Sequence, residues 1–127
     1  MTYSRMPASK TEILDWIISA NQTYPHLLLV VEKSQVMPRQ GIVSAFRYGD
    51  HFGIFETACL MLRFPYHEVR PNVWKKRMGL SSAKIDSIMA CRRLFPNVVL
   101  VRPGCRKPHD GIAEALLIAE WARRCDL

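Results

Sequence analysis

The sequence predicts an α/β fold because short apolar runs rich in β-branched residues alternate with longer segments of helical periodicity. Its 127 residues suffice for one domain, which we expect to span residues 1–127, and a hydrophobic content of 49% supports a packed core. Uninterrupted apolar windows stay far below 18 residues, so we expect no membrane span.

The first helix is expected over residues 9–22. Ser9 stands at the N-cap position and Glu12 follows three residues later, which is the spacing of a capping box. Apolar residues then recur at helical spacing and predict one buried stripe, formed by Ile13, Trp16, Ile17 and Ala20. Tyr24 and Pro25 end the helix.

A strand is expected over residues 27–31, where the run LLLVV is typical of a parallel-sheet strand buried on both faces. This strand ends at Glu32. Residues 34–41 form a loop, and residues 42–62 form a helix with a glycine-containing interruption at residues 48–53.

The second half predicts shorter elements and one long closing helix. They are a strand at 66–70, a short helix or turn at 72–79, a helix at 81–94, a strand or extended link at 98–101, and a helix at 110–124 with Asp110 as N-cap. Phe55 and Trp74 are expected in the core.

The net charge of +7 and the pI near 9.6 favour a polyanionic partner, bound through phosphate contacts. The alternative is an ordinary basic protein with a solvated charged face. The basic residues form two groups along the chain: Arg70, Lys75, Lys76, Arg77 and Lys84, then Arg102, Arg106 and Lys107.

The four cysteines show neither C-x-x-C spacing nor a nearby histidine of zinc-site type, so we expect reduced thiols. The N-terminal residues contain no apolar segment of a secretory signal. Both observations indicate a cytoplasmic protein.

Three carboxylates are candidate metal ligands. Glu32 lies at the carboxyl end of a predicted strand, where α/β sheets tend to bind ligands. Asp110 and Glu114 share one face of the last helix, and their like charges call for a nearby positive charge such as a divalent cation. The alternatives are a solvated Glu32, a capping Asp110 and an exposed Glu114.

Three blocks of the sequence occur in the order of one known family. They are VVEKSQVMPRQGIVSAFRYGDHFGIFE, HEVRPNVWKKRMGLSSAKIDSIMACRRLFP and HDGIAEALLIAEW. Together they resemble the RuvC-like Holliday-junction resolvases, especially the phage, cyanobacterial and chloroplast branch, over roughly residues 27–124. The resemblance implies an RNase H-like fold.

That resemblance also implies a site and a substrate. The resemblance implies that Glu32, Asp110 and Glu114 hold Mg²⁺ or Mn²⁺, which serves the cleavage of phosphodiester bonds in branched DNA. The implied DNA contacts come from Arg70, Lys75, Lys76, Lys84, Arg106, Lys107 and His109. Phe46, Tyr48, His51 and Phe52 lie on a helix that, in the family, faces the junction and a partner subunit.

The sequence departs from the family at its start. The resolvases begin with a strand that carries the first metal-binding Asp, followed by a β-meander, and residues 1–8 contain no acid. We therefore expect a reduced or absent N-terminal meander, and a homodimer or exchanged segment covering the edge of strand 27–31. Three readings stay open: a truncated resolvase, a non-cleaving DNA-binding relative, or an active enzyme that borrows an acid from a second subunit.

Overall fold

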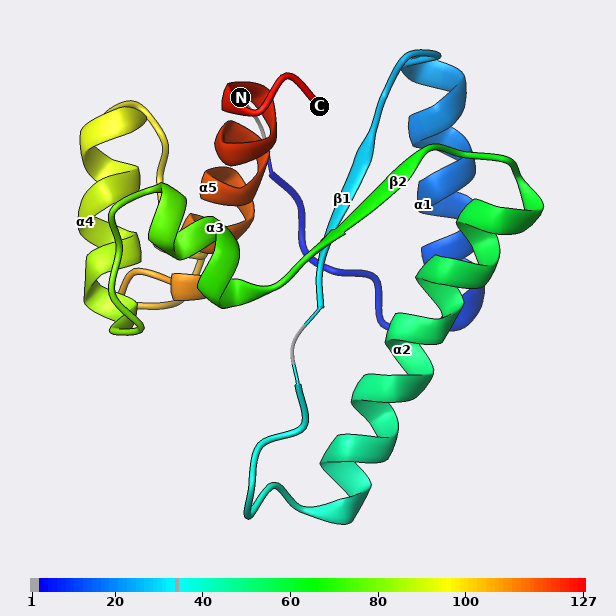
Figure 1. Ribbon diagram of the computed structural model, residues 1–127, viewed down its shortest axis with the longest axis horizontal. Coiled ribbons are helices and arrows are strands. Elements are labelled where there is room, and N and C mark those ends of the chain that lie inside the picture. Colours follow the sequence, from blue (N-terminus) through cyan, green and yellow to red (C-terminus); the bar gives the residue numbers. More distant parts are fainter. Residues whose placement is uncertain (1–2, 34) are drawn as a thin grey trace. The chain divides into compact units, whose positions relative to one another are not determined.

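The computed structural model describes residues 3–33 and 35–127, which form an α/β chain (Figure 1). The element order is α1 (Lys10–Thr23), β1 (Leu29–Glu32), α2 (Ile42–Met61), β2 (Tyr66–Val69), α3 (Pro71–Arg77), α4 (Lys84–Leu94) and α5 (Asp110–Arg124). None of the described helices is long and apolar enough to cross a membrane.

The backbone divides into two compact units. Unit 2 comprises Arg5–Glu68, and unit 1 comprises Val69–Leu127 with the described N-terminal residues Tyr3 and Ser4. The expectation of one domain over residues 1–127 stays a prediction.

The capping box at the start of α1 is confirmed. The Ser9 hydroxyl accepts a hydrogen bond from the Glu12 backbone N–H at 3.1 Å, and the Glu12 carboxylate accepts one from the Ser9 backbone N–H at 3.2 Å. Two orphan amides of the first turn are thereby satisfied, which explains why the helix begins at this point.

The core of unit 2 lies between α1 and α2. Ile13 and Ile17 are fully buried against Phe55 and Ala58, with Leu29 of β1 and Ile54 packed beside them. Trp16 was expected in the same stripe, and this was wrong, because its side chain is 40% exposed. Only one narrow face of α1 meets α2, so the wider stripe is not buried.

Helix α2 is continuous, so the interruption predicted at residues 48–53 was wrong. A glycine in a helix interior costs only about 1 kcal/mol, and packing of the helix in tertiary structure readily overcomes such a cost. The first turns of α2 extend beyond α1 (Figure 1), and Ile42, Val43 and Phe46 there are strongly exposed.

The sheet of the described residues contains β1 and β2. The backbone N–H of Leu29 donates to the carbonyl of Pro65 at 3.0 Å, which pairs the starts of the two strands, and they run parallel (Figure 1). The strand expected at 27–31 was predicted to be buried on both faces. That was wrong, since every residue of β1 is only partly buried.

Unit 1 is built around α5, which packs against α4 and α3. Its core contains Trp74, as expected, together with Ile88, Cys91, Ala113, Leu116 and Leu117. Helix α4 begins at Lys84 rather than at 81, because Ser81 and Asp86 form a hydrogen-bonded turn ahead of it. All four cysteines are free thiols.

The segment before α5 is an extended link. Within residues 98–101, the structure shows one isolated bridge, between Val101 and Pro108. The N-cap of α5 is His109, and Asp110 is the first helical residue, so the predicted capping role of Asp110 was wrong. The predicted bounds of the helix, 110–124, are confirmed, and the backbone N–H of the N-cap residue His109 donates to the Leu100 carbonyl at 2.9 Å.

Candidate functional site

Helix α5 presents Asp110 and Glu114 one turn apart, near its N-terminus. On the adjoining face of this helix, Ala113 and Leu117 are fully buried in the core of unit 1, which fixes the position of the helix. The two carboxylates are partly buried and face the elements that carry Lys75 and Lys84.

Glu114 forms the more buried of two ion pairs. Lys75 Nζ of α3 lies 2.7 Å from Glu114 Oε1, and the two side chains are 16% and 21% exposed. The hydroxyl of the fully buried Ser87, on α4, donates to the same oxygen at 3.3 Å. One carboxylate oxygen therefore joins the three helices α3, α4 and α5.

Asp110 forms the second ion pair, at the protein surface. Lys84 Nζ lies 2.9 Å from Asp110 Oδ2, with side-chain exposures of 78% and 31%. The hydrogen bond from Lys84 is the main cause that lowers the pKa of Asp110, and the same contact raises the pKa of Lys84. Both groups are thus held in their charged forms.

The positive charge required near Asp110 and Glu114 is therefore supplied by two lysines. Sequence reasoning assigned Lys75 and Lys84 to DNA and missed their role as counter-ions. The pairs join residues 26 or more positions apart, and no local sequence pattern reports such a contact.

The carboxylates of unit 1 alone do not fit the implied metal site. Mg²⁺ and Mn²⁺ prefer several oxygen ligands, and here each of two carboxylates already binds an ammonium group. No group of three or more His, Cys, Asp and Glu side chains suited to a metal occurs within residues 3–33 and 35–127. Glu32 belongs to unit 2, so the three-carboxylate site stays a prediction.

Glu32 is the last residue of β1, as the sequence indicated. The Tyr48 hydroxyl donates to its backbone carbonyl at 3.5 Å, and the next residue, Lys33, pairs with Glu68 at 2.8 Å. Lys33 also lies over the Phe52 ring, 5.6 Å from its centroid. These contacts tie the end of β1 to α2 and β2 within unit 2.

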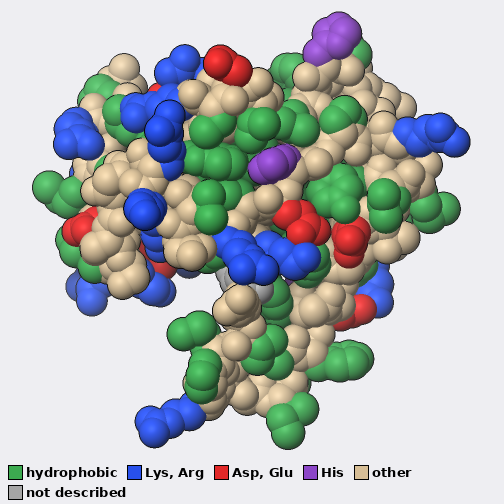
Figure 2. Space-filling view, viewed as in Figure 1, with side chains coloured by type: hydrophobic (Ala, Val, Ile, Leu, Met, Phe, Trp, Pro, Cys, Tyr) green, Lys and Arg blue, Asp and Glu red, His purple; other side chains and the backbone are tan. Residues whose placement is uncertain are grey.

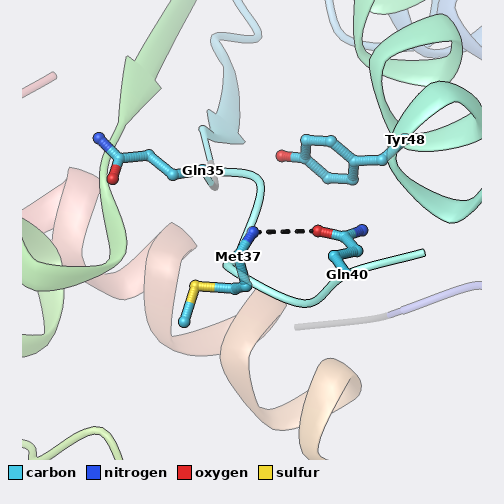
Figure 3. Close-up of a pocket in the computed structure, with 4 residues that line it drawn as sticks. All are labelled: Gln35, Met37, Gln40 and Tyr48. Atoms are coloured by element: carbon cyan, nitrogen blue, oxygen red, sulfur yellow. Dashed lines mark hydrogen bonds between the residues drawn. The ribbon is translucent and has the colours of Figure 1, made fainter. Parts of the chain in front are cut away.

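A pocket that is open to solvent follows the end of β1 (Figure 3). Its lining consists of Gln35, Met37, Gln40 and Tyr48, and the backbone N–H of Met37 donates to Gln40 Oε1 at 3.1 Å. Of the aromatic residues expected to face a partner, Phe46 is 77% exposed. Tyr48 and Phe52 stack with their ring centroids 6.4 Å apart.

His109 packs over the first turn of α5. A Cβ placed on Gly111 would lie 3.0 Å from His109 Cε1, so the glycine makes room for the imidazole ring. Nδ1 of His109 is buried, and it has no hydrogen-bond partner among the residues that the structure describes. The histidine side chain is therefore held against the helix start, next to Asp110.

The net charge is confined to unit 1. This unit contains 12 Lys and Arg against 5 Asp and Glu, a balance of +7, whereas unit 2 contains 6 of each and is neutral. Figure 2 shows several separate groups of Lys and Arg side chains on the part of the surface that unit 1 forms. The exposed members of the predicted DNA-binding set are Arg70, Lys76, Lys84, Arg106 and Lys107.

Comparison with known proteins gives a structural match. No family model matches the sequence, and no curated protein matches it. Among solved structures, T. thermophilus RuvC in complex with a Holliday junction substrate matches with a TM-score of 0.58 and 18% identity, covering 97% of this chain and 76% of that one. The chain therefore has an α/β fold like that of RuvC, as the sequence resemblance implied.

Proposed function

We propose that this chain binds branched DNA in the manner of a junction resolvase. The observation that carries the proposal is that the whole net charge of +7 lies in unit 1, the unit that also presents Asp110 and Glu114. The RuvC-like fold supports the choice of a branched substrate, since the matching RuvC is bound to a Holliday junction.

The basic side chains of unit 1 would bind DNA through its phosphate backbone. Lysine and arginine side chains bind phosphates with release of counterions, so each contact adds affinity without reading the base sequence. The exposed basic residues fit this role: Arg70, Lys76, Lys84, Arg106 and Lys107. His109 directly precedes Asp110 and packs over the first turn of α5, so a phosphate near Asp110 would come within its reach.

Magnesium-dependent cleavage by Glu32, Asp110 and Glu114 is the second candidate activity, that of a structure-specific endodeoxyribonuclease. The carboxylate chemistry of the three residues favours it. The two lysine ion pairs favour the alternative, a non-catalytic DNA-binding protein derived from a truncated resolvase. DNA binding is common to both, and it is the function proposed here.

We further propose that the chain forms a homodimer and that it is located in the cytoplasm. The exposed apolar residues at the start of α2, Ile42, Val43 and Phe46, suit contact with a second copy, and the short sheet has edges to cover. Light scattering after size-exclusion chromatography tests this state, and a monomer at micromolar concentration would exclude it.

The test is binding of a fluorescent four-way junction and of a matched linear duplex, measured by anisotropy over a series of salt concentrations. We expect tighter binding of the junction. Lys76→Ala and Lys107→Ala should each lower the slope of log affinity against log salt by about 1, since each removes one phosphate contact. Arg5→Ala, in neutral unit 2, is the matched control.

Equal loss in the control and in the unit 1 variants would overturn the proposal, as would equal affinity for junction and duplex. A parallel cleavage assay with Mg²⁺, including Glu32→Gln, decides between the enzyme and its non-catalytic alternative. Cleavage that disappears in Glu32→Gln identifies the enzyme. Salt-sensitive binding without cleavage identifies the binding protein.

A further inference from the structure

We infer that a basic loop, residues 102–107, enters the major groove of one arm of the branched DNA, an inference that rests on the proposed function and deepens it. The loop belongs to unit 1 and lies between α4 and α5, in orange in Figure 1. All six of its residues are exposed, so the whole loop is accessible to a large partner.

Backbone pairing closes the basic loop at its base. Val101 and Pro108 form an antiparallel bridge, and the backbone N–H of His109 donates to the Leu100 carbonyl at 2.9 Å. Leu100 is buried in unit 1, and His109 is the N-cap of α5. Both ends of the loop are therefore anchored to the packed part of unit 1.

The tip of the loop is a defined turn, formed by Arg102, Pro103, Gly104 and Cys105. The carbonyl of Arg102 accepts a hydrogen bond from the backbone N–H of Cys105 at 3.0 Å, and Gly104 has a φ of +77°. Proline followed by a glycine with positive φ is the pattern of a type II turn. Because proline fixes its own φ and glycine tolerates this one, the turn is held in shape before DNA binds. Less conformational entropy is then lost on binding.

The charge of the loop is available to a polyanion. Three of its six residues are basic, Arg102, Arg106 and Lys107, and none is acidic. Within residues 3–33 and 35–127, no ion pair involves any of these three side chains. Lys75 and Lys84 differ from them, because each is paired with a carboxylate of α5.

The width of the loop selects the groove. Paired residues of antiparallel segments have Cα atoms about 4.5–5.5 Å apart, and side chains widen the loop on both sides. The minor groove of DNA is about 6 Å wide, whereas the major groove is about 12 Å wide and admits a two-stranded ribbon. Arg102 precedes the turn and Arg106 follows it, so each limb of the loop carries a guanidinium group. In the major groove these groups match the N7 and O6 acceptors of guanine.

The first test uses Cys105 as a reporter at the tip. Alkylation by iodoacetamide is followed by mass spectrometry, with and without a four-way junction at about ten times its Kd. Alkylation of exposed Cys105 should slow about tenfold, because the thiol then reacts only in the unbound fraction. Cys125 follows the far end of α5 and should keep its rate, while Cys59 and Cys91 are buried. An unchanged rate for Cys105 would overturn the inference.

The second test fills the major groove. A junction with glucosylated 5-hydroxymethylcytosine in place of cytosine keeps its phosphates and its minor groove. The wild type should bind it about tenfold more weakly than the plain junction, which is the order expected for loss of one arginine–guanine pair. The double variant Arg102→Gln, Arg106→Gln should bind both junctions alike. The matched control, Arg92→Gln with Arg93→Gln in the last turn of α4, should keep the tenfold difference.

The third test concerns the shape of the turn. Gly104→Ala would place a Cβ at a positive φ but would meet no atom within 4 Å, so it strains the turn without a clash or a change of charge. We expect it to bind the plain junction about fivefold more weakly. Gly104→Asn should bind within about twofold of the wild type, because asparagine tolerates this conformation. Equal affinities of the wild type and Gly104→Ala would refute the role of the turn.

The failure of the inference is distinguishable from failure of the proposed function. A wild type that binds the junction and a linear duplex equally well refutes the proposed function, and the inference with it. A wild type that prefers the junction, but binds the glucosylated junction as tightly as the plain one, refutes the inference alone.

Discussion

The ion pair between Lys75 and Glu114 should contribute measurably to the stability of unit 1. Exposed pairs contribute about 0–1 kcal/mol, whereas removal of one partner from a buried pair costs about 3–5 kcal/mol. The side chains here are 16% and 21% exposed and 2.7 Å apart, which places the pair between these limits. We expect a coupling free energy of about 2 kcal/mol.

The assay is a double-mutant cycle of Lys75→Met, Glu114→Gln and both together, followed by urea unfolding at low salt. Each single change should destabilise by about 2 kcal/mol, and the double variant should lose less than the sum, because neither charge is left unpaired. Glu114→Gln retains an acceptor for Ser87, which separates this hydrogen bond from the ion pair. Additive losses would refute the reasoning.

Three further predictions concern other parts of the fold. Ile17→Ala should lower the free energy of unfolding in urea by about 2–4 kcal/mol, because Ile17 is 1% exposed in the core of unit 2. An unchanged free energy of unfolding would show that Ile17 does not belong to the core. Ser9→Ala should cost about 1 kcal/mol and lower the helical circular dichroism on heating, through loss of the α1 cap. The Arg123 and Arg124 guanidinium groups lower the pKa of Glu120 from 4.5 to about 2. This depressed pKa adds stability above pH 4.5 that is lost as the pH falls toward 2, so thermal melts of Glu120→Gln should depend less on acid over that range than those of the wild type.

Local signals in the sequence predicted the elements well. The Ser9–Glu12 spacing predicted the start of α1, and the helix predicted over residues 110–124 has the bounds of α5. Trp74 and Phe55 were correctly placed in the core. Such features depend on residues within one or two helical turns of each other, which a single sequence displays directly.

Errors arose where neighbours from elsewhere in the chain decide the outcome. The burial of Trp16 depended on how much of α1 meets α2, and the continuity of α2 depended on packing that offsets its glycines. The partial exposure of β1 depended on how much of the strand other parts of the chain cover. The spacing of apolar residues along one segment does not report which other segments pack against it.

The sequence by itself determined an α/β chain with a basic second half and two carboxylates one turn apart on its last helix. Only the tertiary structure decided what those carboxylates contact. Lys75 and Glu114 are 39 residues apart and Lys84 comes from a different helix, so their pairing exists only once α3, α4 and α5 pack together. Charge attraction acts through space, and the fold alone sets which charges lie within hydrogen-bonding distance.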